Sequence, residues 1–213
     1  MLQDLKIQKL ISKLQISSKP QLLPVKVESF SMFLNCYGNV EQKIKKDGGR
    51  IRYGWQIHLK ELLCEAEHHA VWENEKGQLI CITPNQDNKE QILFFLDDEK
   101  VWEGKNIGNV RVNATNNELV DEFIKVCDAL DVLYNFSNRV NDFELKIKPD
   151  IAKIIADFEY TKNVYYTRIV YGDTINSPCF CKSGKTYSNC HKIALPSLIE
   201  QYMIDVKRIY ENN

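Results

Sequence analysis

The sequence predicts an α+β fold, in which a small antiparallel sheet is followed by C-terminal helices. Two observations support this fold class. Between residues 50 and 96, segments rich in β-branched and aromatic residues alternate with short polar breaks, a pattern typical of strands. Beyond about residue 116, apolar residues instead recur at helical spacing. Strands followed by helices, rather than strands alternating with helices, are typical of an α+β protein.

Four strands are expected in the sheet, and the clearest turn is ENEKG, between Trp72 and Gln78. A helix from Cys36 to Lys46 should precede the sheet and pack on one of its faces. Asn35 is available as its N-cap, and Gly48–Gly49 is a stop signal. The strand segments are RIRYGWQIHL, LLCEAEHHAVWEN, GQLICITP and QILFFL.

Leucines and isoleucines between Leu2 and Leu14 predict an amphipathic first helix that packs on the main body. The next segment, SSKPQLLP, contains two prolines and is expected to be an extended linker. Three further helices are expected: residues 119–133, a helix after Pro149, and a C-terminal helix with Pro196 in its first turn. We therefore divide the chain into a body (1–116), a helical segment (117–175) and a C-terminal module (176–213).

Composition limits the function classes. The 213 residues carry 28 basic and 29 acidic side chains, so no global positive field favours nucleic acid. No stretch approaches the ~18 uncharged apolar residues of a membrane span, and the N-terminus lacks the pattern of a secretory signal. A cytoplasmic protein is expected, and the sequence leaves its oligomeric state open. In a reducing compartment, seven cysteines suggest metal ligands, a nucleophile or packing groups rather than disulfides.

The segment SPCFCKSGKTYSNCHKI carries Cys179 and Cys181, a Ser–Gly turn, and then Cys190 and His191. Two close pairs of soft ligands separated by a short turn can complete a tetrahedral zinc site at little entropic cost. With all four positions filled by protein, no place is left for a reactive water. The expected Zn²⁺ is therefore structural.

This segment resembles the SEC-C motif, the zinc-binding tail of the SecA translocase and of many other bacterial proteins. The matching pattern is P-C-x-C-x-S-G-x-x-x-x-x-C-H, from Pro178 to His191. We call the segment the zinc knuckle, and the resemblance implies that it recruits a protein partner. The body is similar to uncharacterised bacterial SEC-C-containing proteins with Y-G-W and E-A-E-x-H-A-V-W blocks, which implies no established activity.

A second candidate site pairs Cys36, at the start of a helix that would favour its thiolate, with His69 on a following strand. This order is similar to papain-like and transglutaminase-like folds, where such a pair acts as nucleophile and general base. Gln56 or the Cys36 backbone amide would then stabilise an oxyanion. The position where the resemblance implies an aspartate carries Cys81, so the imidazole would be oriented by Asn85, by Glu67 or Asp98, or by no residue.

Two function hypotheses follow. In the first, the chain is a zinc-binding adaptor: the body binds a ligand or polypeptide, and the knuckle docks a protein partner. In the second, it is a cysteine hydrolase or acyltransferase that uses Cys36 and His69. Against the second, Cys36 is also compatible with a buried packing role, because cysteine is among the most buried residue types. Cys64 and Cys127 are predicted to be packing groups, and His58 is expected at the surface of its strand.

Overall fold

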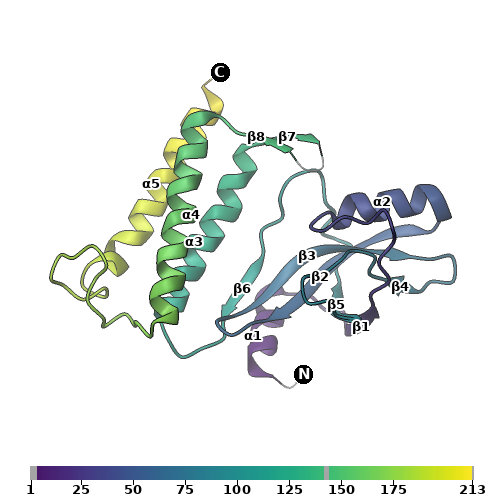
Figure 1. The fold of residues 1–213 in the computed structure, drawn as a ribbon, viewed down its shortest axis with the longest axis horizontal. Coiled ribbons are helices and arrows are strands. Elements are labelled where there is room, and N and C mark those ends of the chain that lie inside the picture. Colours follow the sequence, from purple (N-terminus) through teal and green to yellow (C-terminus); the bar gives the residue numbers. More distant parts are fainter. Residues whose placement is uncertain (1–3, 142–143, 213) are drawn as a thin grey trace. The chain divides into compact units, whose positions relative to one another are not determined.

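The computed structural model describes residues 4–141 and 144–212 (Figure 1). The chain forms two compact units, one from residues 1–60 and 64–110 and the other from residues 61–63 and 111–213. The first contains the antiparallel sheet and the second contains the long C-terminal helices. The predicted α+β class is confirmed.

Two helices and five strands make up the first unit, and the strands are all antiparallel neighbours in the order β1-β5-β2-β3-β4. The predicted strands and the Cys36 helix are present. Their bounds are α1 (Leu5–Leu14), β1 (Pro20–Pro24), α2 (Cys36–Asp47), β2 (Arg50–Leu59), β3 (Leu63–Glu73), β4 (Leu79–Ile80) and β5 (Gln91–Leu96), and β6 (Val110–Asn113) follows.

The expectation that the proline-containing segment is a linker is wrong, because it forms strand β1. Its register pairs Pro20 with Phe95 and Leu23 with Ile92. A proline lacks the N–H that a central strand needs, but both prolines stand at the ends of β1, where this loss is tolerated. Leu23 between them is 4% exposed, so β1 contributes to the core.

The sheet of the first unit curls until its two ends meet. Strand β4 pairs with β3 only through Ile80–Trp72 and Leu79–Glu73. The chain then turns to β1, where Cys81 N–H donates to the Pro24 carbonyl at 3.0 Å and Cys81 O accepts from Lys26 N–H at 2.8 Å. We call the result the barrel. Its interior is filled by Leu23, Val71, Cys81, Ile92 and Phe94.

Helix α2 packs on the outside of the barrel, where Cys36 and Val40 contact Ala70, Ile80 and Ile82. It begins at Cys36, as predicted, and ends at Asp47, one residue beyond the predicted end. Asn35 occupies the N-cap position without a side-chain capping bond. Gly48 is the C-cap residue, and its φ of 70° lies in the left-handed region that glycine tolerates.

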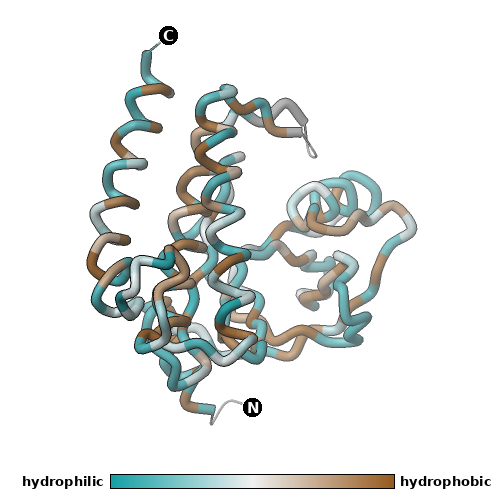
Figure 2. Tube along the Cα trace, turned by 60° about the vertical axis from the view of Figure 1, so that its left-hand side comes forward, coloured by the Kyte–Doolittle hydropathy of each residue, from teal (hydrophilic) through white to brown (hydrophobic). Residues whose placement is uncertain are grey.

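Three long helices form the second unit: α3 (Leu119–Leu133), α4 (Pro149–Val170) and α5 (His191–Glu211). A 3₁₀ turn (Tyr134–Phe136) and the short strands β7 (Asn138–Asn141) and β8 (Glu144–Lys146) separate α3 from α4. In Figure 2, hydrophobic residues recur along each long helix between hydrophilic ones. The buried ones form a single core that includes Val120, Leu133, Ile151, Tyr165, Leu195 and Val206.

The expected position of Pro196 in the first turn of the last helix is wrong. Helix α5 begins at His191, and Pro196 lies inside it. The earlier start is fixed by the loop that precedes it, since Lys192 N–H donates to the Tyr187 carbonyl at 3.1 Å. None of the helices in the described part of the chain combines the length and the apolar character needed to cross a bilayer.

Replacing Gly54 with alanine should destabilise the first unit. The new Cβ would lie 2.1 Å from the Phe95 carbonyl oxygen and 2.5 Å from the Phe94 ring. We expect a loss of about 3 kcal/mol in the free energy of unfolding, because backbone cannot move aside as a side chain can. Urea unfolding followed by tryptophan fluorescence measures this, since all three tryptophans lie in the first unit.

Gly38→Ala is the matched control for this substitution. The three atoms nearest to its Cβ would all belong to the side chain of Asn35, which makes no capping bond and can rotate away. Alanine also favours the helix over glycine by up to about 1 kcal/mol. An equal loss in both variants would contradict the close approach of β5 to Gly54.

Candidate functional site

Four predicted metal ligands meet at the start of α5. Cys179 and Cys181 come from the loop after α4, Cys190 is the N-cap residue of α5, and His191 is its first residue. Their ligand atoms all lie within 4.8 Å of one another. Cys179 Sγ lies 3.1 Å from His191 Nδ1, and Cys190 Sγ lies 3.6 Å from Cys181 Sγ and 3.5 Å from His191 Nδ1. Bond lengths of ~2.0–2.3 Å put the edges of a zinc tetrahedron at roughly 3.5–3.8 Å, so the donors suit one ion.

The loop that carries the first two cysteines turns back sharply. Lys182 and Gly184 both have left-handed backbone, with φ of 59° and 79°. Cys179 N–H donates to the Lys185 carbonyl at 2.8 Å, and Pro178 pairs with Thr186 as an antiparallel bridge. The Ser–Gly turn predicted from the sequence therefore brings the first ligand pair back toward the second.

Aromatic rings connect the metal cluster to the core of the second unit. The Phe180 ring lies 4.9 Å from the His191 ring and 5.3 Å from the Tyr165 ring, measured between centroids. The buried hydroxyls of Tyr165 and Tyr187 are hydrogen bonded at 2.6 Å. Cys179 itself is 5% exposed and belongs to this core. A metal ion bound here would thus fix residues that pack against α3 and α4.

The cysteines of the cluster differ in their electrostatic environment. Burial raises the pKa of Cys179. The exposed Cys181 receives a hydrogen bond from the Ser183 hydroxyl, which lowers its pKa to about 7. A thiol that ionises near neutral pH binds a metal ion more readily, because the form of cysteine that binds metals is the thiolate.

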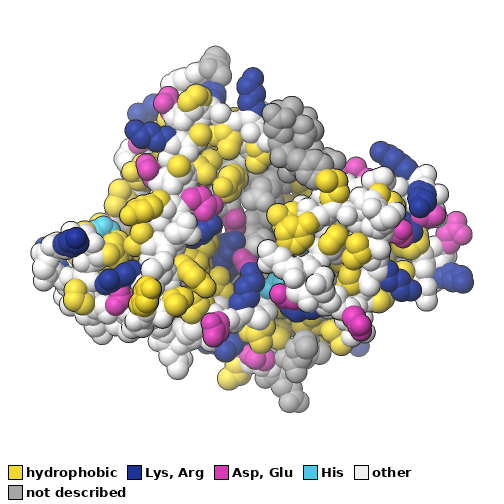
Figure 3. Space-filling view, viewed as in Figure 1, with side chains coloured by type: hydrophobic (Ala, Val, Ile, Leu, Met, Phe, Trp, Pro, Cys, Tyr) yellow, Lys and Arg dark blue, Asp and Glu magenta, His cyan; other side chains and the backbone are white. Residues whose placement is uncertain are grey.

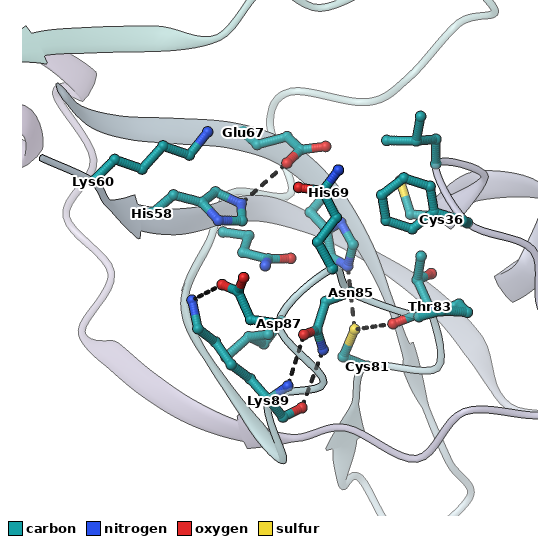
Figure 4. Close-up of a pocket in the computed structure, with 16 residues that line it drawn as sticks. Cys36, His58, Lys60, Glu67, His69, Cys81, Thr83, Asn85, Asp87 and Lys89 are labelled. Atoms are coloured by element: carbon teal, nitrogen blue, oxygen red, sulfur yellow. Dashed lines mark hydrogen bonds and ion pairs between the residues drawn. The ribbon is translucent and has the colours of Figure 1, made fainter. Parts of the chain in front are cut away.

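A separate pocket of about 440 Å³ opens in the first unit, at the side of the barrel where the chain leaves β4 (Figure 4). We call it the barrel pocket. It brings together the four residues predicted for the second site: Cys36, Gln56, His69 and Asn85. Figure 4 places Cys36, His69 and Cys81 along one side of it. The other lining residues are Phe33, Leu34, His58, Lys60, Glu67, Thr83, Pro84, Gln86, Asp87, Lys89 and Ile92.

The Cys36 thiol is a protonated group in this environment. Burial raises its pKa to about 12, and a hydrogen bond from the backbone N–H of Ala70 only partly offsets this effect. A position at the start of α2 therefore does not outweigh desolvation. At neutral pH the thiolate is a very small fraction of the Cys36 population.

His69 faces Cys81 in the structure. Its Nε2 lies 3.3 Å from Cys81 Sγ. Burial lowers the pKa of His69 to about 4 and raises that of Cys81 to about 11, so both groups are neutral near pH 7. Position 81, which the resemblance implied would carry an aspartate, does supply the partner of the imidazole, but that partner is a neutral thiol.

The other residues considered for orienting His69 have different partners. The Asn85 side chain bonds the backbone of Lys89, accepting from its N–H at 2.7 Å and donating to its carbonyl at 3.1 Å. Glu67 lies 3.1 Å from His58 Nε2. Asp98 accepts from Arg52 Nε at 3.0 Å. Catalytic roles for Cys36, His69, Gln56 and Asn85 stay predictions.

Two parts of the pocket were not singled out from the sequence. His58 was expected at the surface, but its position two residues from Gln56 on β2 places both on one face and could have indicated the pocket. Phe33 and Leu34 lie in a loop without periodicity, and no sequence signal marked them. Comparison with known protein families, curated proteins and solved structures finds no match to this chain.

The buried His69 should make the first unit sensitive to mild acid. Its folded pKa of about 4 lies below the unfolded value of about 6.5, so the unfolded chain binds the proton first and stability falls as pH drops below ~6.5. We expect a loss of about 1 kcal/mol between pH 7.5 and 5.5, measured by urea unfolding with tryptophan fluorescence. His68, whose pKa is also lowered by burial, adds to the effect.

His69→Gln isolates the contribution of this residue. The variant should lose less stability than the wild type between the two pH values, because glutamine takes up no proton in this range. An unchanged pH dependence in His69→Gln would show that His69 is not held neutral by burial.

Proposed function

We propose that this chain is a zinc-binding adaptor. In this function, Cys179, Cys181, Cys190 and His191 hold a structural Zn²⁺, the module around them docks a protein partner, and the barrel binds a ligand. The observation that supports it most strongly is the convergence of three thiols and one imidazole within 4.8 Å.

Zinc is the ion favoured by the donor set. Three thiolates and one imidazole are soft or borderline ligands, and a tetrahedral arrangement of sulfur and nitrogen is typical of zinc. Four protein ligands complete this coordination without water. The ion would therefore stabilise the second unit rather than activate a reactant.

The surface of the cluster supports a docking role. Lys182 and Lys185 are exposed beside the ligands, and Ile193 in the first turn of α5 is 71% exposed. Figure 3 shows basic and apolar side chains over this end of α5. A partner with an acidic segment next to an apolar side chain would complement these groups. The resemblance to the SEC-C motif agrees with recruitment of a protein.

A cysteine hydrolase or acyltransferase is the second candidate function. One observation favours it: Cys36, at the first residue of a helix, shares a pocket with His69. The charge state of both groups favours binding instead, because the thiol is held protonated and the imidazole faces Cys81. Nucleophilic catalysis would need an activated thiolate.

Removal of the metal should unfold the second unit selectively. A metal present at about 1,000 times its dissociation constant adds about 4 kcal/mol to the free energy of unfolding. This corresponds to an increase of more than about 10 °C in the unfolding temperature. We expect a chelator to lower the midpoint temperature of unfolding, followed by circular dichroism at 222 nm, by at least about 10 °C. The midpoint followed by tryptophan fluorescence, which reports the first unit, should change little.

Variants test whether the cluster is the site of binding. Cys190→Ser should lose the single zinc equivalent measured with a chromophoric chelator, and Cys127→Ala, a cysteine outside the cluster, should keep it. A chelated protein with an unaltered transition at 222 nm would rule out a structural role for the metal.

Docking through the module should depend on its charge. Immobilised zinc-loaded protein carrying Lys182→Glu and Lys185→Glu should retain at least tenfold less of the proteins that the wild type captures from cells that produce it. Lys207→Glu, an exposed lysine near the end of α5, is the matched control. Equal capture by all three proteins would place the docking surface elsewhere.

Alkylation of Cys36 separates the two candidate functions. For binding, iodoacetamide should modify Cys36 of the zinc-loaded protein at pH 8 at least 100-fold more slowly than an unfolded peptide thiol, because the pKa is about 12 rather than about 8.5. Mass spectrometry of the Cys36 peptide measures the rate. Rapid modification below pH 8.5 that disappears in His69→Ala would establish the hydrolase instead.

A further inference from the structure

The charged side chains that line the barrel pocket already have partners. Lys60 Nζ lies 3.0 Å from Glu65, and Lys89 Nζ lies 2.7 Å from Asp87. Glu67 lies 3.1 Å from His58 Nε2. A charged ligand would have to compete with these contacts and would bring a charge that the pocket does not balance. The pocket is therefore better suited to an uncharged ligand.

Gln56 is the polar group left open to such a ligand. It lies on β2 opposite Glu67 and points to the same face of the sheet as His69, whose partner is Gly54. Gln56 is 7% exposed, and in the described part of the chain no residue hydrogen bonds its side-chain amide. The amide lines the pocket, so it offers both a donor and an acceptor to a molecule that binds there.

His69 adds an acceptor. In one tautomer that fits this geometry, the Cys81 thiol donates to the Thr83 carbonyl at 3.7 Å, and His69 Nε2, 3.3 Å from the same sulfur, carries the hydrogen of their contact. Nδ1 is left with a lone pair, and no residue between 4–141 or 144–212 is its partner. The pocket thus offers one amide and one imidazole acceptor, all neutral.

An apolar rim borders these neutral groups. Phe33 is 43% exposed and Leu34 is 79% exposed, and Leu34 has a left-handed backbone with φ of 61°. Such a conformation is unfavourable for leucine. The loop is held by the buried Asn39, which accepts from Met32 N–H and donates to the Met32 carbonyl, both at 2.8 Å. The two apolar side chains are thereby kept at the mouth of the pocket.

We propose that the barrel pocket binds an uncharged peptide amide, with Gln56 and His69 as its hydrogen-bonding groups and Phe33 and Leu34 in contact with an adjacent apolar side chain. The ligand carbonyl accepts from Gln56 Nε2, and a ligand N–H donates to Gln56 Oε1 or His69 Nδ1. A peptide bond carries this donor and acceptor together. The inference rests on the proposed binding role of the barrel and specifies the class of its ligand.

Three leucine derivatives that differ in charge test the ligand class on the zinc-loaded full chain. N-acetyl-leucinamide is neutral, N-acetyl-leucine carries a carboxylate, and leucinamide carries an ammonium group. We expect the neutral probe to shift the side-chain amide resonances of Gln56 in a saturable manner, with at least tenfold higher affinity than either charged probe. Equal or tighter binding of a charged probe would overturn the inference, and so would the absence of saturable shifts with all three.

Variants test the role of Gln56. Gln56→Met, which keeps the length of the side chain without its hydrogen-bonding groups, should weaken binding of N-acetyl-leucinamide at least tenfold, measured through backbone amide shifts around the pocket. Gln21→Ala, an exposed glutamine on β1, should leave the affinity unchanged. Unchanged affinity in Gln56→Met would contradict the assigned contact. The wild-type comparison of the three probes does not depend on how the variants fold.

The outcome is separable from that of the proposed function. Zinc stoichiometry and capture by the C-terminal module are measured independently of the probes. If those tests succeed and all probes fail, only the ligand class is wrong. If N-acetyl-leucinamide binds and the chelator has no effect on the second unit, the structural zinc is wrong and the ligand class stands.

Discussion

The convergence of four ligands at the start of α5 is the constraint on which the C-terminal half depends. The ligands span only residues 179–191, yet they belong to the core and to a helix terminus at once: Cys179 is buried among the residues of α3 and α4, and His191 is the first residue of α5. Three thiols so close together could not all ionise without a cation, because each thiolate would repel the others. The proposed zinc would relieve this repulsion and determine where α5 begins.

The first unit depends on a change of strand partner. Strand β4 leaves β3 after two residue pairs, and Cys81 bonds the backbone of β1 instead. This change leaves the Ala70 N–H available to Cys36 and puts the Cys81 thiol beside His69. Burial raises the pKa of Cys81 to about 11, whereas the exposed Cys181 of the metal cluster has a lowered pKa.

Local features could be predicted from the sequence. Four strands, the α2 boundaries and the ENEKG turn follow from period-two patterning and from glycine signals that act within a few residues; in the structure Asn74 N–H bonds the Gln78 carbonyl at 3.1 Å across that turn. The metal cluster was predictable for the same reason, because all its ligands are close in sequence. Cys64 and Cys127 are buried, as expected of packing groups.

Non-local features could not be predicted. Strand β1 forms because β5, some seventy residues later, offers an edge, and proline content alone suggested a linker. The meeting of His69 with Cys81 depends on the closure of the barrel. The protonated state of Cys36 depends on how completely α2 and the barrel desolvate it, which a helix-terminus argument does not include. The sequence positions of Cys36 and His69 suggested a site. That the charged side chains around this site pair with one another could be seen only in the structure.

X-ray absorption spectroscopy at the zinc edge of the metal-loaded protein tests the metal site most directly, because it reports the atoms bound to the ion. We expect three sulfur atoms at about 2.3 Å and one nitrogen at about 2.0 Å, with no oxygen in the coordination shell. This result would establish a closed structural site formed by Cys179, Cys181, Cys190 and His191. A shell with fewer sulfur atoms and a bound water would contradict it and would indicate an open site available for chemistry.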